Sequence, residues 1–211
     1  MMAYAVKEAF LTLQGEGVQA GSRAVFLRFA GCNLWSGREA DRASAQCNFC
    51  DTDFVGTDGE GGGKFANPGA LADHIAALWG PESRHRLVVI TGGEPMLQLD
   101  SALVEALHAR GFRVAVETNG TLPAVAGIDW ICVSPKAGTD VVQRSGDELK
   151  LVWPQAGIDP AELEGWRFDH FLVQPMDCAA REAAIDAAIK LAMERPKWRL
   201  ALQAHKVVGL P

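Results

Sequence analysis

The sequence predicts an α/β fold: a reduced, open, partial TIM-type barrel of about six parallel strands with few full-length helices. Short apolar runs alternate with helical segments, and this alternation favours a parallel sheet with right-handed crossovers. The 211 residues are fewer than a complete eight-fold barrel normally needs. Polar residues also gather after the apolar runs, as they do at the ligand-binding end of such sheets. We therefore expect a single domain built around one pocket.

Seven apolar runs have the length of buried strands. In chain order they are Arg23–Phe29, Leu87–Ile90, Phe112–Val116, Trp130–Val133, Glu148–Trp153, His170–Val173 and Leu200–Gln203. The segment before the first run ends in LTLQGEG. The glycine-rich run GEGGG at residues 59–63 predicts a mobile loop.

Three segments show the periodicity of amphipathic helices. Asn67 and Pro68 suit the N-cap and first position of a helix that continues to about Trp79. The second segment is Leu97–Arg110, and the third is the alanine-rich segment Ala179–Glu194, whose start follows Cys178 directly. The positions expected on the buried faces are Leu71, Ile75 and Leu78, then Leu99, Leu103 and Leu107, then Ile185, Ile189 and Ala192.

Composition argues against nucleic-acid and membrane partners. The net charge is −6, with 20 Lys and Arg against 26 Asp and Glu, whereas phosphate binding needs a clustered basic surface. No stretch approaches the roughly 18 apolar residues of a membrane span. The start MMAYAVKEAF lacks the apolar core of a signal peptide, and five cysteines are an odd count for a disulfide framework. We therefore expect a cytoplasmic protein with free thiols.

Polar residues follow the ends of several predicted strands. These residues are Cys32, the run 91–94 (TGGE), the run 117–120 (ETNG), the run 134–136 (SPK) and the run 174–177 (QPMD). Each loop alone could be an ordinary turn, because Gly, Pro, Asn and Asp are common loop residues. In a parallel sheet, however, these ends share one face, and ligands bind there. Together the loops predict one ligand pocket.

Three of the five cysteines lie between Gly31 and Phe54. Cys47 and Cys50 form a C-x-x-C pair, and Cys32 precedes the pair by fourteen intervening residues. A structural zinc site needs four protein ligands, whereas a four-iron cluster held by three cysteines leaves one iron open to a small molecule. From the cysteines alone both remain open, because Cys132, Cys178 or a distant histidine could complete a zinc site. A redox pair is less favoured, because no helix opens after the C-x-x-C pair.

The motifs LQGEG, GCNL, CNFCDT, TGGEP, ETNG, SPK and QPMD occur in an order that resembles the radical S-adenosylmethionine superfamily. Within it, the chain is similar to the 7-carboxy-7-deazaguanine synthase family, over nearly its whole length. The superfamily's usual loop is C-x3-C-x2-C, and here about eleven additional residues, 36–46, separate Cys32 from the pair. We expect a single radical S-adenosylmethionine domain over residues 1–211, with this insertion in the cluster loop.

The resemblance implies a [4Fe-4S] cluster on Cys32, Cys47 and Cys50, bound S-adenosylmethionine, and Mg²⁺ on Thr52. Residues implied to contact S-adenosylmethionine are Phe49, Cys50, Asp51, Gly93, Glu94, Ser134, Pro135, Lys136, Gln174, Pro175, Met176 and Asp177. Gly92 completes the GGE motif. Residues implied to contact the substrate are Leu13, Gln14, Gly15, Glu16, Arg28, Thr91, His205 and Pro211. A guanidinium suits the substrate's carboxylate, which favours Arg28. No catalytic side chain is implied beyond the cluster and the radical.

The resemblance also implies a reaction. It would be a carbon–nitrogen lyase reaction of queuosine biosynthesis, which contracts 6-carboxy-5,6,7,8-tetrahydropterin to 7-carboxy-7-deazaguanine with loss of ammonia. A flavodoxin-type electron donor and a homodimer are implied with it. The alternatives are a glycyl-radical enzyme activase of the same superfamily and a zinc-binding module without catalysis. LQGEG, CDT and SPK favour the pterin enzyme.

Overall fold

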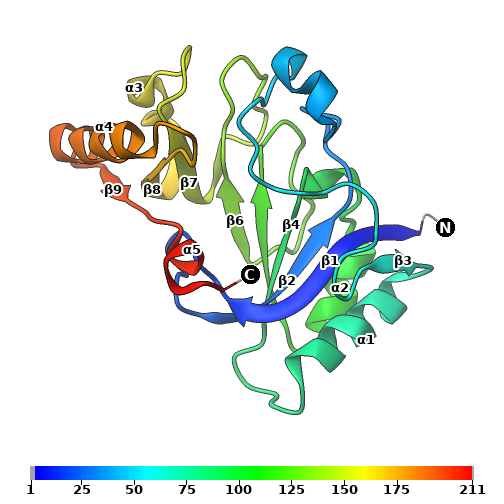
Figure 1. The fold of residues 1–211 in the computed structure, drawn as a ribbon. Helices are drawn as coiled ribbons and strands as arrows, with labels where there is room; N and C mark the ends of the chain where they lie inside the picture. The colour runs from blue at the N-terminus through cyan, green and yellow to red at the C-terminus, as the bar shows by residue number, and fades with distance from the viewer. Residues whose placement is uncertain (1–2, 211) are drawn as a thin grey trace.

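The computed structural model describes residues 3–210, and within this range nine strands form one sheet in the order β3-β1-β2-β4-β5-β6-β7-β8-β9. The strands are β1 Tyr4–Leu13, β2 Arg23–Phe29, β3 Gly63–Phe65, β4 Leu87–Gly92, β5 Arg113–Thr118, β6 Trp130–Val133, β7 Ser145–Trp153, β8 Arg167–Pro175 and β9 Trp198–Leu200. From β2 onward along the sheet, every pairing is parallel, whereas β1 pairs antiparallel with β2 and β3. The sheet curves but stays open (Figure 1), which confirms the predicted partial barrel.

Few helices accompany the strands within residues 3–210. They are α1 Pro68–Trp79, α2 Ser101–His108, α3 Pro160–Leu163, α4 Arg181–Glu194 and α5 Ala204–Val208, with short 3-10 turns η1 Glu39–Ser44 and η2 Pro95–Leu97. Leu71 of α1 and Leu103 of α2 are fully buried against Val25, Val88 and Val114 of the sheet. In Figure 1, α1 and α2 lie at the β1 end of the sheet, and α3 and α4 lie at the β7 and β8 end.

The starts of α1 and α2 are determined by their caps. The amide N–H of Ala70 donates to Asn67 Oδ1 at 2.8 Å, and Pro68 follows at the first helical position, as predicted. In α2 the predicted start at Leu97 is wrong. The side chain of Asp100 accepts from Leu103 N at 2.9 Å, so the helix begins at Ser101.

Strand β1, which lies between β3 and β2, was not predicted from the sequence because Lys7 and Glu8 interrupt its apolar pattern. Lys7 is nevertheless 8% exposed, and its ammonium group lies 2.8 Å from both Asp53 and Asp58. The ion pairs with these two carboxylates allow the charged ammonium group of Lys7 to be buried. The pairing with β2 also carries a bulge at this point, between Val6 and Glu8.

The glycine-rich run that predicts a mobile loop instead packs against β1 and leads into β3. Ala9 N donates to Glu60 O at 2.7 Å, and Gly59 N donates to Lys7 O at 2.9 Å. A Cβ at Gly61 would lie 2.2 Å from the carbonyl oxygen of Ala9. Only glycine permits this close approach of two backbones.

Two expectations for the last third of the chain are wrong. Helix α4 begins at Arg181 and buries Ala184, Ala188 and Leu191, whereas Ile189 is 42% exposed. Small alanines let the helix lie close to the sheet, so the larger Ile189 is on the outer side. The last strand, β9, ends at Leu200, because the chain then turns toward the first loop, where Ala204 N donates to Gly15 O at 2.8 Å.

None of the helices between residues 3 and 210 combines the length and apolar character needed to cross a bilayer.

Candidate active site

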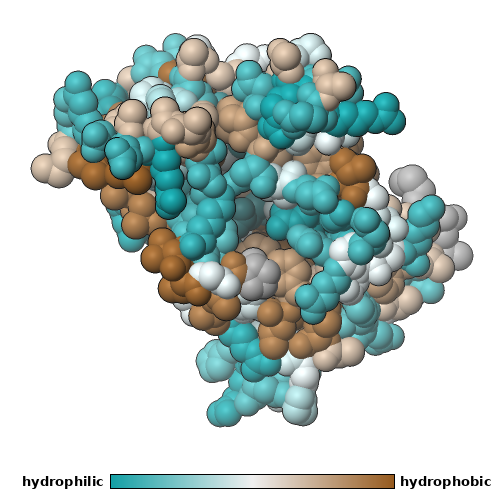
Figure 2. Space-filling model, in the orientation of Figure 1, coloured by the Kyte–Doolittle hydropathy of each residue, from teal (hydrophilic) through white to brown (hydrophobic). Residues whose placement is uncertain are grey.

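A cavity of about 390 Å³ lies at the carboxyl ends of the parallel strands. Its volume is within the range of small-molecule sites. The loops after β1, β2, β4, β5, β6 and β8 line it, together with residues of the C-terminal segment. Figure 2 shows this hollow with hydrophilic residues beside it and hydrophobic residues along its lower rim. The sequence prediction that the polar loops share one pocket is thus confirmed.

Most of the predicted site residues line this cavity. They are Leu13, Gln14, Gly15, Glu16, Arg28, Cys32, Cys47, Phe49, Cys50, Asp51, Thr52, Thr91, Gly93, Ser134, Lys136, Gln174, Pro175, Met176, Asp177 and His205. Glu94 and Pro135 are absent from the described wall, and Pro211 lies outside the described residues. Glu117, Thr118 and Asn119 of the predicted pocket loop 117–120 line it as well, although the sequence assigned them no particular ligand. Lining residues to which the sequence assigned no role are Lys7, Glu8, Phe10, Phe26, Leu34, Asp53, Lys150, Val152, Gln203 and Lys206.

The three thiols of Cys32, Cys47 and Cys50 share one side of the cavity. Burial is the main influence on Cys32 and Cys47, and it raises the pKa of both thiols. Within residues 3–210, no three His, Cys, Asp or Glu side chains are close enough to hold a single metal ion. Three cysteines that line one cavity fit a multi-iron cluster, because the ligands of such a cluster bind different iron atoms.

The glycines of the TGGEP loop bring β4 against the start of the cysteine loop. A Cβ at Gly93 would lie 2.4 Å from Gly31 O, and Glu94 N donates to the same carbonyl at 3.0 Å. Any larger residue at position 93 would push the loops apart. The two loops therefore hold Cys32 in a fixed place.

Glu94 is fully buried and lies behind this wall. Its carboxylate accepts from Thr118 Oγ1 at 2.7 Å, from Asn119 N at 2.8 Å and from Met96 N at 2.9 Å. Burial raises the pKa of Glu94, and these hydrogen bonds oppose the shift. In this structure Glu94 joins the loops after β4 and β5, so its expected contact with S-adenosylmethionine stays a prediction.

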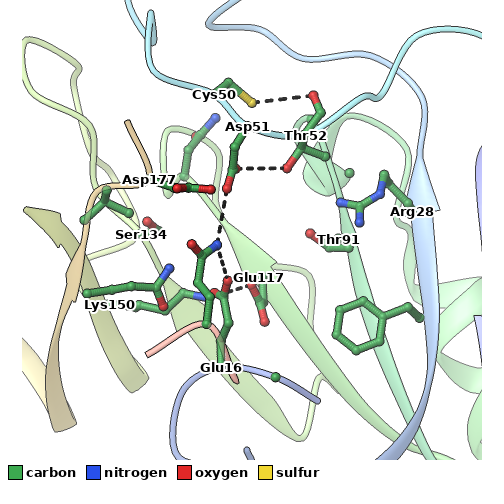
Figure 3. A pocket seen from close by; sticks show the side chains of 18 of the residues that line it. Glu16, Arg28, Cys50, Asp51, Thr52, Thr91, Glu117, Ser134, Lys150 and Asp177 are labelled. Carbon is green, nitrogen blue, oxygen red and sulfur yellow. Dashed lines mark hydrogen bonds and ion pairs between the residues drawn. The ribbon is translucent and has the colours of Figure 1, made fainter. Parts of the chain in front are cut away.

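A buried group of charges forms the opposite side of the cavity. We call Glu16, Glu117 and Lys150 the Lys150 cluster (Figure 3). Lys150 is 3% exposed, and its ammonium group contacts Glu16 and lies 2.8 Å from Glu117. Gln14 donates to Glu117 at 2.9 Å. Two carboxylates against one ammonium leave the cluster with one net negative charge.

The charges of the Lys150 cluster stabilise one another. Burial acts to lower the pKa of Lys150, but Glu117 and Glu16 raise it well above its usual value. Burial likewise acts to raise the pKa of Glu16, but Lys150 and Gln203 bring it below its usual value. These directions favour the charged forms of Lys150 and Glu16. The sequence signal for this cluster was a lysine between two apolar residues of β7, Leu149 and Leu151.

Arg28 lies across the cavity from the Lys150 cluster. Its Nε donates to Glu8 Oε1 at 2.7 Å, which fixes the guanidinium on the β1 and β2 ladder. Figure 3 shows the guanidinium directed into the cavity, toward Thr52 and Thr91. An anion in the cavity would find this positive charge on the side away from Glu16 and Glu117.

Helix α5 closes one edge of the cavity. Lys206 Nζ lies 2.7 Å from Asp51 and 2.5 Å from Asp177, so one side chain ties α5 to two loops. Gln203 donates to Glu16 at 2.9 Å. A Cβ at Gly15 would lie 2.1 Å from His205 Nδ1, so glycine allows α5 to lie directly on the first loop. Sequence periodicity could not find a helix of this length.

We expect Lys206→Met to loosen α5 and to weaken substrate binding severalfold. Burial acts to raise the pKa of Asp51, but the hydrogen bond from Lys206 lowers it. Burial acts to lower the pKa of Lys206, but Asp177 and Asp51 raise it. The contribution of the pair is therefore present at neutral pH. It is lost as pH falls through the lowered pKa of Asp51, or rises through the raised pKa of Lys206. Hydrogen exchange of the α5 amides in wild type and variant measures how far α5 is loosened.

The matched control is Lys190→Met, because Lys190 is 73% exposed on α4 and does not line the cavity. Equal α5 exchange rates in Lys206→Met and Lys190→Met would contradict the prediction.

Comparison with known proteins agrees with this geometry. Residues 41–148 match the family model described as the radical SAM superfamily. The chain is 62% identical to 7-carboxy-7-deazaguanine synthase of Bordetella pertussis and 61% identical to that of Caulobacter vibrioides, each over 210 residues and 100% of both chains. The crystal structure of QueE from Escherichia coli aligns with a TM-score of 0.69 at 25% identity, covering 97% of this chain and 96% of that one. The chain therefore belongs to the radical SAM superfamily and, within it, to the 7-carboxy-7-deazaguanine synthase family.

Proposed function

We propose that this enzyme converts 6-carboxy-5,6,7,8-tetrahydropterin to 7-carboxy-7-deazaguanine with loss of ammonia, as a step of queuosine biosynthesis. The observation that carries the proposal is the cavity itself, in which three thiols face a buried pair of carboxylates across a space of small-molecule size. The full-length similarity to synthases favours this function over a glycyl-radical activase or a zinc-binding module.

Cys32, Cys47 and Cys50 would hold the cluster at the thiol side of the cavity. When bound, a [4Fe-4S] cluster and S-adenosylmethionine supply a 5′-deoxyadenosyl radical that takes hydrogen from the substrate. Lys136 is placed to bind the carboxylate or ribose of S-adenosylmethionine. Its Nζ donates to Ser134 Oγ at 2.7 Å and to Ser134 O at 2.8 Å, and it lies 5.9 Å from the ring centroid of Phe49. Pro135, Pro175, Met176 and Asp177 complete this proposed subsite.

The Lys150 cluster and Arg28 would orient the substrate between them. Carboxylates of Glu16 and Glu117 can accept the N–H groups of a pterin edge, and Arg28 can bind the substrate's carboxylate in a bidentate way. The Lys150 cluster is negative and Arg28 is positive. A substrate bound in the reversed orientation would therefore place its carboxylate beside the carboxylates of Glu16 and Glu117. Leu13, Gly15 and Thr91, together with His205 of α5, would exclude water from the bound substrate.

Gln174 offers a direct test of the S-adenosylmethionine subsite. It is 4% exposed on the cavity wall, and its Oε1 is a buried acceptor without a partner within residues 3–210. A bound ligand that donates a hydrogen bond would satisfy it. We expect Gln174→Met to weaken S-adenosylmethionine binding about tenfold, as for one lost hydrogen bond, while the cluster-free protein stays as stable as wild type or more so.

Equilibrium dialysis and thermal unfolding measure the two quantities. The control is Gln143→Met, because Gln143 accepts from Ala124 N at 3.1 Å and donates to Ser145 O at 2.6 Å. This variant should lose stability and keep its affinity for S-adenosylmethionine. Unchanged affinity for S-adenosylmethionine in Gln174→Met, together with weakened affinity in Gln143→Met, would argue against the subsite.

Thr52 is the proposed protein ligand of Mg²⁺. It lies on the cavity wall between Cys50 and Arg28, where a hard cation could bind its hydroxyl oxygen, the substrate and water. We expect product formation to fall without Mg²⁺ in wild type, and Thr52→Val to lose the stimulation by Mg²⁺. Thr57→Val, which changes a nearby threonine off the described cavity wall, should keep it. Full stimulation of Thr52→Val by Mg²⁺ would remove Thr52 from the metal site.

The resemblance is also the basis for proposing a flavodoxin-type electron donor, a homodimer and a cytoplasmic location. That residues 1–211 act as a single domain is likewise a proposal, supported by the continuous sheet across residues 3–210.

A further inference from the structure

The insertion at residues 36–46 folds back on the cysteine loop. It contains the 3-10 turn η1, seen at the top of Figure 1, and this turn carries Arg42. Nη1 of Arg42 donates to the backbone carbonyls of Asn48 at 3.1 Å and Cys50 at 3.0 Å. Its Nε donates to the carboxylate of Glu39 at 2.8 Å. One side chain of the insertion therefore contacts the backbone of the C-x-x-C pair.

Arg42 lies on an aromatic base that joins both ends of the loop. Its guanidinium carbon is 4.1 Å from the ring centroid of Trp35, which is 8% exposed. Trp35 contacts Phe54 edge to face, with ring centroids 5.6 Å apart, and Phe54 is 1% exposed. Trp35 follows Cys32 closely, and Phe54 follows Cys50 closely. Arg42 thus links the C-x-x-C backbone to a base anchored at both ends of the loop.

A glycine makes this arrangement possible. Gly37 has φ +79°, and a Cβ there would lie 2.3 Å from Val55 Cγ2. The insertion can therefore turn sharply and lie against the segment after the cysteines. Trp35 Nε1 donates to Arg38 O at 3.1 Å across the same turn.

We infer that Arg42 is a positioning residue for the cluster ligand Cys50. A short loop between the first two cysteines keeps them close together. A loop with fourteen intervening residues is less restricted, so it loses more conformational entropy when the cysteines are brought together to bind a cluster. Charge-assisted hydrogen bonds from a guanidinium held by Trp35 and Glu39 restore that restriction. The inference rests on the proposed ligation by Cys32, Cys47 and Cys50.

Arg42 also adds a positive charge beside a proposed cluster ligand. Reduction of an iron–sulfur cluster adds negative charge, and nearby positive charge favours the reduced state. Arg42 therefore raises the reduction potential of the bound cluster. A role in packing alone would leave this potential unchanged.

The test compares Arg42→Gln, Arg42→Lys and the control Arg38→Gln, which changes an exposed arginine of the same insertion. In cluster-free protein, hydrogen exchange at residues 47–54 measures how firmly the loop is held. In reconstituted protein, the rate of iron loss to a chelator and the midpoint potential measure the effect on the cluster. Thermal unfolding shows whether each variant keeps its fold.

We expect Arg42→Gln to exchange and to lose iron about tenfold faster than Arg38→Gln, the effect of about one hydrogen bond to a charged group. Its midpoint potential should also be more negative. Arg42→Lys keeps the charge but not the guanidinium geometry. It should show the potential of wild type and an intermediate rate of iron loss.

Equal exchange and iron-loss rates in Arg42→Gln and Arg38→Gln would overturn the inference. If Arg42→Gln does not fold, Arg42→Lys decides, and rates equal to those of Arg38→Gln overturn it. A wild-type protein that holds no cluster would overturn the proposed ligation instead. The exchange rates of the cluster-free proteins would then still decide the role of Arg42 in holding the loop.

Discussion

Replacing Cys47 with alanine is expected to abolish iron binding and, with it, all formation of 5′-deoxyadenosine. Cys47 lines the thiol side of the cavity with Cys32 and Cys50, and a cluster held by three thiolates has no protein ligand in reserve. The side chain is small, so the fold should tolerate the change. Iron and sulfide content after anaerobic reconstitution, normalised to chain concentration, measures the effect.

Cys132→Ala is the matched control, because Cys132 is another buried cysteine. It lies on β6, its Sγ is 3.5 Å from Glu148, and it does not line the main cavity. Burial first, and then Glu148, raise its pKa well above the usual value, so it stays a neutral thiol. The variant should keep its iron and lose about 1 kcal/mol of stability. Loss of iron in Cys132→Ala would contradict the assignment of ligands.

Lys150→Met is expected to lower the free energy of unfolding by about 3–5 kcal/mol and to abolish product formation. The change leaves Glu16 and Glu117 buried without their ammonium partner, which is costly in the protein interior. It also removes the positive charge that lowers the pKa of Glu16 against the effect of burial, beside the proposed substrate. Urea unfolding of the cluster-free protein measures stability, and product formation by reconstituted protein measures activity.

Lys190→Met provides the control for stability, because Lys190 is exposed and lies 3.8 Å from Glu194, which is also exposed. That variant should stay within about 0.5 kcal/mol of wild type. Adding Glu16→Gln and Glu117→Gln to Lys150→Met should recover part of the stability, because no buried charge is then left unpaired, without recovering activity. A Lys150→Met protein as stable as Lys190→Met would show that the Lys150 cluster is not a stabilising ion pair.

The sequence predicts the location of the site well because topology determines it. Once strands such as Leu87–Ile90 and Trp130–Val133 are recognised as parallel, the loops after them must lie at one face of the sheet. The three cysteines and most of the other predicted site residues meet there. Motif order gave the family, which the full-length comparisons support.

Features that depend on long-range pairing were harder to predict. Lys7 is buried in β1 because Asp53 and Asp58, far along the chain, neutralise it. Lys150 is buried for the same reason, through Glu16 and Glu117. In the sequence such lysines interrupt the apolar pattern of a strand, because the carboxylates that pair with them lie far away along the chain. The position of Glu94 behind the wall likewise depends on hydrogen bonds from the neighbouring loop.

The most direct test of the account is an anaerobic assay of reconstituted enzyme with dithionite, S-adenosylmethionine, Mg²⁺ and 6-carboxy-5,6,7,8-tetrahydropterin. Chromatography and mass spectrometry follow 7-carboxy-7-deazaguanine and 5′-deoxyadenosine together. We predict that the deazapurine forms, and that none forms with Cys47→Ala. Formation of 5′-deoxyadenosine without the deazapurine would contradict the proposed substrate, and absence of both would contradict the proposed radical chemistry.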